Sequence, residues 1–151
     1  MNELQKIKYQ LLKEKNQTKI KEFGWKNNIL YQECVTALGE SDVLTMEETD
    51  RITELVQQNF LFNLGSIDWK RFRDGVEIKQ EELVHRFNRN DSYYILWDCG
   101  ELPFVKANFE RILKALDDVL AVSFNTWLLS VDGKEIIEFH HEGIIRYGSR
   151  I

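Results

Sequence analysis

Two runs of alternating residues meet at an Asp132-Gly133 step, and this step constrains the fold more than any other part of the chain. The runs are Ala121–Val131 and Lys134–His141, and both contain the β-branched and aromatic residues that favour strands. An Asp-Gly pair between two such runs is the strongest short-range signal of a β-hairpin, because its turn requires positive φ angles. The sequence therefore predicts an antiparallel hairpin here.

Strand signals continue on both sides of this hairpin. Tyr93–Trp97 is a short β-branched and aromatic run of the kind that forms a buried strand. Glu142-Gly143 offers a second turn, and Ile144–Tyr147 after it is typical of another strand. Between the first strand and the hairpin, Pro103 stands where it can open a helix, and apolar residues recur at helical spacing over Val105–Leu116. We therefore expect a strand, a helix and then a meander of strands.

The first half of the chain carries helical signals. Apolar side chains recur at helical spacing, with polar caps and a glycine stop at the expected ends. The helices predicted in this way run over Leu4–Leu11, from an Asn27 or Asn28 cap to the Gly39 stop, and from a Thr45–Glu48 capping box through Val56. Glycines interrupt the pattern between Phe60 and Asn90, where we expect a short strand at Ile67–Phe72 and a helical turn or two at Glu81–Phe87.

The order of these elements predicts an α+β fold. The helical N-terminal half should pack on a mixed or antiparallel sheet formed mainly by the C-terminal half. A length of 151 residues suits one domain of ordinary size, and the chain contains no internal repeat, low-complexity tract or linker. We therefore expect a single domain over residues 1–151.

The net charge of −5 is unevenly distributed along the chain. Met1–Lys26 carries seven lysines against three glutamates, so the rest of the chain has a net charge of −9. Phosphate contacts need clustered lysine and arginine, and an acidic body therefore argues against direct binding of nucleic acid. It fits a basic protein partner, although acidity also serves simply to keep a protein soluble.

We expect neither a membrane-spanning segment nor a signal peptide in this sequence. No stretch approaches the ~20 apolar residues of a membrane-spanning helix, and the lysine-rich start has no apolar core of a signal peptide. We expect a cytoplasmic protein that needs no cofactor. In that compartment Cys34 and Cys99, which share no metal or redox spacing, should be reduced and partly buried rather than joined in a disulfide.

The adjacent histidines His140 and His141 are the first candidates for chemistry. Strand alternation would place them on opposite faces, so they could not chelate one ion together. The same alternation puts Glu138, His140 and Glu142 on one outward face, where they could offer three ligands or could simply be solvated. We expect no metal site there.

Asp98-Cys99-Gly100-Glu101 follows the predicted Tyr93–Trp97 strand. A cysteine at a strand end is a candidate nucleophile, but neither a Cys–His arrangement nor a glycine-rich phosphate loop accompanies it, and a turn is the alternative.

Two further features are candidates for binding a partner. Asp117 and Asp118 fall at the C-terminal end of the predicted Val105–Leu116 helix, where the helix dipole disfavours negative charge by ~0.3–1 kcal/mol. Such an unfavourable placement of charge indicates either a functional role or a turn into the next strand. Trp127 lies on a strand face with Ser123 and Asn125; it is either a half-exposed interface anchor or a residue packed under a helix.

The second half resembles a known family of bacterial proteins. The pieces that carry the likeness are Trp97-Asp98, Leu102-Pro103, Asp117-Asp118-Val119, Thr126-Trp127-Leu128 and Ile137–Gly143. Over about Tyr94–Gly148 they look like the immunity proteins of contact-dependent growth inhibition and related polymorphic toxin systems. This resemblance implies an antitoxin that binds the toxic C-terminal domain of a cognate effector, commonly a nuclease, and covers its active site.

If the resemblance holds, acidic side chains should meet a basic cleft on the toxin. We expect those to be Asp98, Glu101, Asp117 and Asp118, with Trp127 as an apolar anchor. The two acidic pairs flank one predicted helix and would be roughly 20 Å apart at ~1.5 Å rise per residue.

Two other classes of function stay open. One is a metal-dependent hydrolase or nuclease that uses Asp98, Glu101, Glu138 and His140, brought together from separate strands. The other is a homo-oligomeric scaffold.

Overall fold

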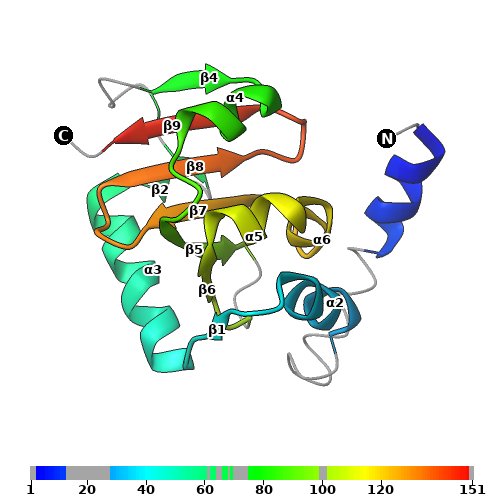
Figure 1. Cartoon of the computed structure of the whole chain (residues 1–151), viewed down its shortest axis with the longest axis horizontal. Coiled ribbons are helices and arrows are strands. Elements are labelled where there is room, and N and C mark those ends of the chain that lie inside the picture. Colours follow the sequence, from blue (N-terminus) through cyan, green and yellow to red (C-terminus); the bar gives the residue numbers. More distant parts are fainter. Residues whose placement is uncertain are drawn as a thin grey trace.

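The computed structural model describes residues 3–12, 28–60, 62–63, 66–67, 69, 75–98 and 102–149. These residues form a seven-stranded sheet in the order β1-β6-β5-β7-β8-β9-β4, in which all neighbouring strands are antiparallel (Figure 1). Its strands are β1 (Asp42–Val43), β4 (Val76–Ile78), β5 (Ser92–Trp97), β6 (Val105–Asn108), β7 (Thr126–Ser130), β8 (Glu135–Phe139) and β9 (Ile145–Ser149). A separate two-stranded sheet pairs β2 (Phe62–Asn63) with β3 (Ser66–Ile67).

Helices come mainly from the first half of the chain. The described helices are residues 3–12, α2 (Ile29–Leu38), α3 (Met46–Phe60), α4 (Gln80–Arg86), α5 (Phe109–Lys114) and α6 (Leu116–Ala121). The predicted α+β class is therefore confirmed, with an antiparallel sheet built mostly by the C-terminal half. Among the described residues, no helix is long and apolar enough to cross a membrane.

The helix ends of the first half follow the predicted signals. Asn28 caps α2, its Oδ1 accepting the backbone N–H of Tyr31 at 2.9 Å, and Gly39 ends this helix at a φ of 69°. Thr45 and Glu48 form the expected capping box before α3: the Thr45 Oγ1 accepts the Glu48 N–H at 3.1 Å, and the Glu48 Oε1 accepts the Thr45 N–H at 3.3 Å. The two caps were therefore predicted correctly.

Replacing the Asn28 cap should weaken the fold measurably. Asn28 is fully buried, and loss of an N-cap side chain costs about 0.5–2 kcal/mol of unfolding free energy. Asn28→Ala should therefore unfold at lower urea, while Asn28→Ser, which keeps a capping oxygen, should lose less. Equal urea midpoints for Asn28→Ala and the parent would contradict this role of the side chain.

The predicted hairpin is present, with a shorter first strand than expected. β7 and β8 pair antiparallel from Thr126↔Phe139 to Leu129↔Ile136, and Gly133 in the turn between them has a φ of 75°. Ala121 belongs to α6 instead of the strand, and β7 begins only at Thr126. The expected strands at Tyr93–Trp97 and Ile144–Tyr147 are β5 and β9, with small shifts at their ends.

The predicted Val105–Leu116 helix is wrong over its first four residues and is divided into two short helices beyond them. Val105–Asn108 is β6, which pairs with β5 through Ile95↔Val105 and Tyr93↔Ala107. Burial alternates along this segment, since Val105 and Ala107 are buried while Lys106 and Asn108 are half-buried, as a strand requires. The helix starts later, at Phe109, where the Asn108 Oδ1 accepts the Glu110 N–H at 2.9 Å. Pro103 therefore precedes a strand.

The stretch between Phe60 and Asn90 is only partly described. The helical turns expected at Glu81–Phe87 are present as α4. Of the strand expected at Ile67–Phe72, Ile67 lies in β3; Trp69 is a 3-10 turn residue, and the other residues lie outside the described part.

The sheet has one face under α5 and α6. Ile95, Leu128 and Ile137 stand side by side across β5, β7 and β8, and all three are fully buried. On the same strand as Ile95, Tyr93 packs against Phe109 of α5 with ring centroids 5.1 Å apart, and the Trp97 Nε1–H donates to the Val119 carbonyl of α6 at 2.9 Å. The strand ends that carry polar side chains therefore lie next to α6.

Candidate functional site

A chain of hydrogen bonds joins three strand ends at one edge of the molecule. Asp98 follows β5, Asn125 precedes β7, and His141 lies just beyond β8. The Asp98 Oδ2 accepts the backbone N–H of Asn125 at 3.2 Å and its side-chain Nδ2–H at 3.3 Å. The Asn125 Oδ1 accepts the backbone N–H of His141 at 3.0 Å and lies 3.1 Å from its Nδ1. Asn125 thus connects the carboxylate to the imidazole.

This network favours one tautomer of the neutral His141 ring. A carboxylate only accepts, so the Asn125 Nδ2 must face Asp98 and the Asn125 Oδ1 must face His141. The His141 Nδ1 then has to donate, and in the neutral ring the Nε2 is left as an acceptor. In its neutral form, His141 therefore keeps a lone pair on Nε2.

The expectation that His140 and His141 occupy opposite faces is wrong. β8 ends at Phe139, and a turn closes at once, with the Gly143 N–H donating to the His140 carbonyl at 2.9 Å. The two imidazole rings lie with centroids 4.1 Å apart and a tilt of 32°. The His140 Nδ1 accepts the Glu142 N–H at 3.2 Å, so the neutral His140 carries its proton on Nε2. In their neutral forms, the two rings therefore combine one Nε2 donor, on His140, with one Nε2 acceptor, on His141.

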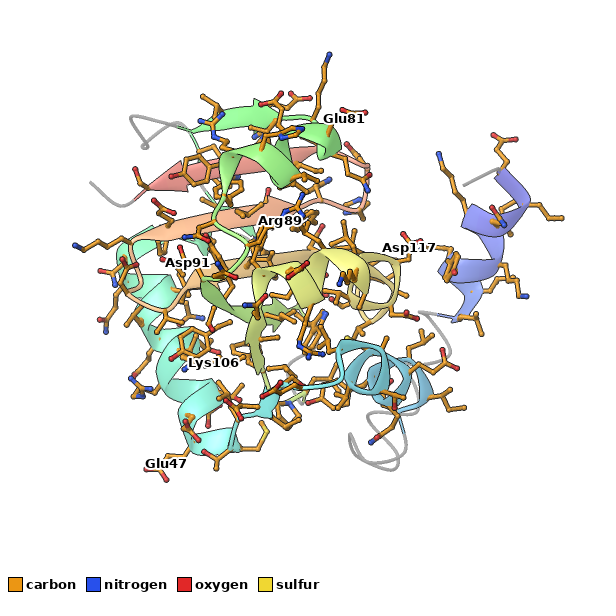
Figure 2. All side chains as sticks on the ribbon, in the orientation of Figure 1. Glu47, Glu81, Arg89, Asp91, Lys106 and Asp117 are labelled. Atoms are coloured by element: carbon orange, nitrogen blue, oxygen red, sulfur yellow. The ribbon has the colours of Figure 1, made fainter. Side chains whose placement is uncertain are left out.

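A pocket of about 320 Å³ lies beside this histidine pair. Residues of the 3–12 helix form one wall, and α6 and the ends of β7 and β8 form the others. Its polar lining includes Lys6, Asp117, Thr126, His140, His141 and Glu142, and its apolar lining includes Leu120, Phe124 and Phe139. In Figure 2, Asp117 points from α6 toward the N-terminal helix.

Thr126 has an unusual environment in this pocket. Its side chain is 1% exposed, and its Oγ1 has no hydrogen-bond partner among the described residues. Thr126 pairs with both Trp97 and Phe139 and therefore points toward the α6 face of the sheet. A buried hydroxyl without a partner costs about 1–3 kcal/mol, which native structures rarely tolerate without reason.

Asp117 and Asp118 do not lie where the sequence placed them. They occupy the first turn of α6, where the helix dipole favours negative charge. The unfavourable charge–dipole interaction that the sequence predicted is therefore absent. Asp117 is exposed, and Asp118 is half-buried and faces α2.

Burial, and after it the charge of Asp118, raises the pKa of the Cys34 thiol to about 12. Cys34 is therefore a fully buried free thiol with little nucleophilic character, while Cys99 lies outside the described residues.

The two acidic pairs were expected roughly 20 Å apart because they would flank one continuous helix. That continuous helix is not formed, so the expected separation does not apply. Asp98 reaches His141 through Asn125, and His141 lines the same pocket as Asp117. The structure thus brings Asp98 and Asp117 to one end of the sheet. Glu101 lies outside the described residues.

Trp127 is not a half-exposed anchor. Its side chain is 4% exposed, and its Nε1–H donates to the Glu138 Oε2 at 2.9 Å. Glu138 is equally buried, and its Oε1 accepts the Trp69 Nε1–H at 3.1 Å. The expected outward face of Glu138, His140 and Glu142 is therefore wrong, because Glu138 points into the protein between two indoles.

This burial also removes Glu138 from the alternative catalytic set. Both of its carboxylate oxygens are engaged by tryptophans, and Asp98 is engaged by Asn125. In the part of the chain that the structure describes, no group of three or more histidine, cysteine, aspartate or glutamate side chains is placed to hold a metal ion.

Comparison with known proteins identifies one family. The model of the family described as CdiI immunity protein EcoliA0-like matches residues 28–148. The match covers most of the chain and reaches well beyond Tyr94–Gly148, into α2 and α3. No curated protein matches the chain.

Proposed function

Because the chain belongs to the CdiI immunity protein EcoliA0-like family, we propose that it binds and neutralises a cognate bacterial toxin domain. Membership supports a role as an immunity protein and points to binding rather than catalysis. In this proposal the protein acts in the cytoplasm, one copy covers one toxin domain, and the toxin is a nuclease whose active site is occluded.

Acidic and polar groups gather at one end of the sheet, and this arrangement supports our choice of the toxin-binding surface. Asp98 and Asp117 are exposed there, beside the stacked His140 and His141. A nuclease must attract phosphate, so its cleft is positively charged, and an acidic inhibitor is drawn to that field. The acidic end of the sheet is therefore the surface we assign to the toxin. The half-buried Asp118 and Glu101, which lies outside the described residues, stay proposed contacts.

Trp127 plays no direct part in this surface, because it is buried within the sheet. The polar groups around Asn125 are held rigidly, since Asn125 bonds to both Asp98 and His141 and the Ser123 Oγ donates to its carbonyl at 2.7 Å. Rigid polar groups lose little conformational freedom on binding and so favour affinity.

The proposal predicts a salt-dependent interaction that requires the acidic end of the sheet. Purified toxin domain from the neighbouring gene should bind the chain with one-to-one stoichiometry, and its association rate should fall as salt rises. Asp98→Ala and Asp117→Ala should each weaken binding by about twofold to fivefold, because an exposed ion pair contributes about 0.2–1 kcal/mol. Association and dissociation rates measured at several salt concentrations provide the test.

Glu47→Ala and Glu81→Ala are matched controls, because both glutamates are exposed but lie on α3 and α4 (Figure 2). They should bind like the parent. Failure of the chain to protect cells from the toxin would contradict the proposed function. Protection together with unchanged binding by both aspartate variants would place the interface on another surface.

A further inference from the structure

We propose that the pocket between α6 and the 3–12 helix is a receptor for an arginine side chain of the partner. The identity of that partner rests on the proposed function, but the chemistry of the pocket does not. The groups that line it select a flat, multivalent hydrogen-bond donor with a positive charge.

Carboxylates outnumber cations in the lining. Asp117 and Glu142 supply carboxylates, and the neutral form of His141 supplies a lone pair on Nε2 when its Nδ1 donates to Asn125. Lys6 is the only full positive charge among the described lining residues. Two carboxylates against one ammonium group favour a cationic guest over an anion.

The Thr126 hydroxyl gives an independent reason to expect a guest. It lines the pocket at 1% exposure, and its Oγ1 lacks any partner among the described residues. An N–H donor inserted from the pocket would satisfy it and recover the free energy that its burial costs. Since the acceptors sit on different sides of the pocket, a guest with several donors satisfies more of them than a guest with one.

The apolar walls suit a flat guest. Phe124 meets His141 edge to face, with centroids 6.4 Å apart, and His141 stacks on His140. A guanidinium group stacks on aromatic faces and presents five donors in one plane, whereas an ammonium group is a compact and strongly hydrated point charge. Arginine therefore fits this lining better than lysine.

The size of the pocket agrees with a side chain as its occupant. A volume of about 320 Å³ lies at the lower end of the ~300–1,000 Å³ range of ligand pockets, too small for a large cofactor. Arginine is also one of the residues most enriched among the energetic anchors of protein interfaces.

The test needs no toxin. N-acetyl-L-arginine methylamide is titrated into the full chain, and the imidazole C–H signals are followed by NMR. The chain has three histidines, and His85 on α4 serves as the internal reference. We expect the signals of His140 and His141 to move with a dissociation constant of about 1 mM, while that of His85 stays in place. The matched citrulline compound, which is neutral but nearly the same shape, should bind at least about tenfold more weakly, as loss of ~1.4 kcal/mol would give.

Two variants make the outcome specific to the pocket. Asp117→Asn should weaken arginine binding by about fivefold to tenfold. Thr126→Val should weaken it as well, although its melting temperature should not fall below that of the parent, because the variant removes a buried hydroxyl that has no partner. Glu81→Gln, on α4, should change nothing.

Equal binding of the citrulline compound, equal movement of the His85 signal, or unchanged binding by both pocket variants would each overturn the inference. The immunity function is tested separately, by protection of cells from the toxin. If the chain protects cells but does not bind the arginine compound, only the arginine pocket is overturned. If it binds the arginine compound but does not protect cells, only the proposed immunity function is overturned.

Discussion

Replacing Glu138 by alanine should lower the free energy of unfolding by about 3–5 kcal/mol. The carboxylate is 4% exposed and accepts one indole N–H on each oxygen, from Trp69 at 3.1 Å and from Trp127 at 2.9 Å. A hydrogen bond to a charged group contributes about 1.5–3 kcal/mol, and truncation also leaves a cavity between two large rings. Because domains of this size are stable by only about 5–15 kcal/mol, the variant should lose a large fraction of its stability.

The measurement is urea unfolding followed by tryptophan fluorescence, since two of the fluorophores contact the altered residue. Glu138→Gln should lose less, about 1–3 kcal/mol, because one oxygen can still accept while the amide nitrogen faces a donor. Glu135→Ala is the matched control: it removes a partly exposed glutamate from the same strand and should change stability by less than about 0.5 kcal/mol. A loss below about 1 kcal/mol in Glu138→Ala would show that the carboxylate does not hold the two indoles.

Features that depend on neighbouring residues were predicted correctly from the sequence. The Asp132-Gly133 hairpin, the Thr45–Glu48 capping box and the Asn28 and Gly39 ends of α2 all form as expected. Each needs only a few adjacent residues with a particular backbone conformation or side-chain oxygen, so the sequence contains the whole interaction.

The segment from Val105 onward shows why apolar spacing misleads. Val105, Phe109, Ile112 and Leu116 are all buried, as the helical pattern requires, but they belong to a strand and two short helices. The strand exists because β6 pairs with β5, and pairing between separate segments cannot be read from the spacing within one of them. The error also displaced Asp117 from the start of one helix to the end of another.

Contacts between distant segments also explain why the sequence did not predict the burial of Trp127 and Glu138 or the hydrogen bonds of Asn125. Trp127 and Glu138 lie on one face of the sheet, since they pair directly across β7 and β8. What buries that face at this point includes Trp69, which lies far away in the sequence. Asn125 was likewise missed as the link between Asp98 and His141, because its two partners are 27 residues before it and 16 residues after it.

Trp97 connects the sheet to the helix that carries Asp117, and its removal should have the second large effect. Its side chain is 3% exposed, its Nε1–H donates to the Val119 carbonyl of α6 at 2.9 Å, and its ring meets Tyr31 of α2 edge to face at 5.5 Å. Trp97→Ala should lower the free energy of unfolding by about 3–5 kcal/mol. Trp97→Phe keeps most of the packing and should lose about 1–3 kcal/mol.

The Trp97 variant should also loosen α6 selectively. This helix has six residues and is too short to persist without tertiary contacts. Hydrogen exchange of its amides should therefore speed up in Trp97→Ala by more than the global loss of stability explains.

Trp127→Ala is the matched control, because Trp127 is equally buried on the neighbouring strand but points to the opposite face of the sheet. It should destabilise the protein to a similar extent without a local change at α6, and toxin binding should suffer more in Trp97→Ala, since α6 positions Asp117. Equal exchange of the α6 amides in the two variants, compared at equal global stability, would mean that the Trp97 contact does not hold this helix in place.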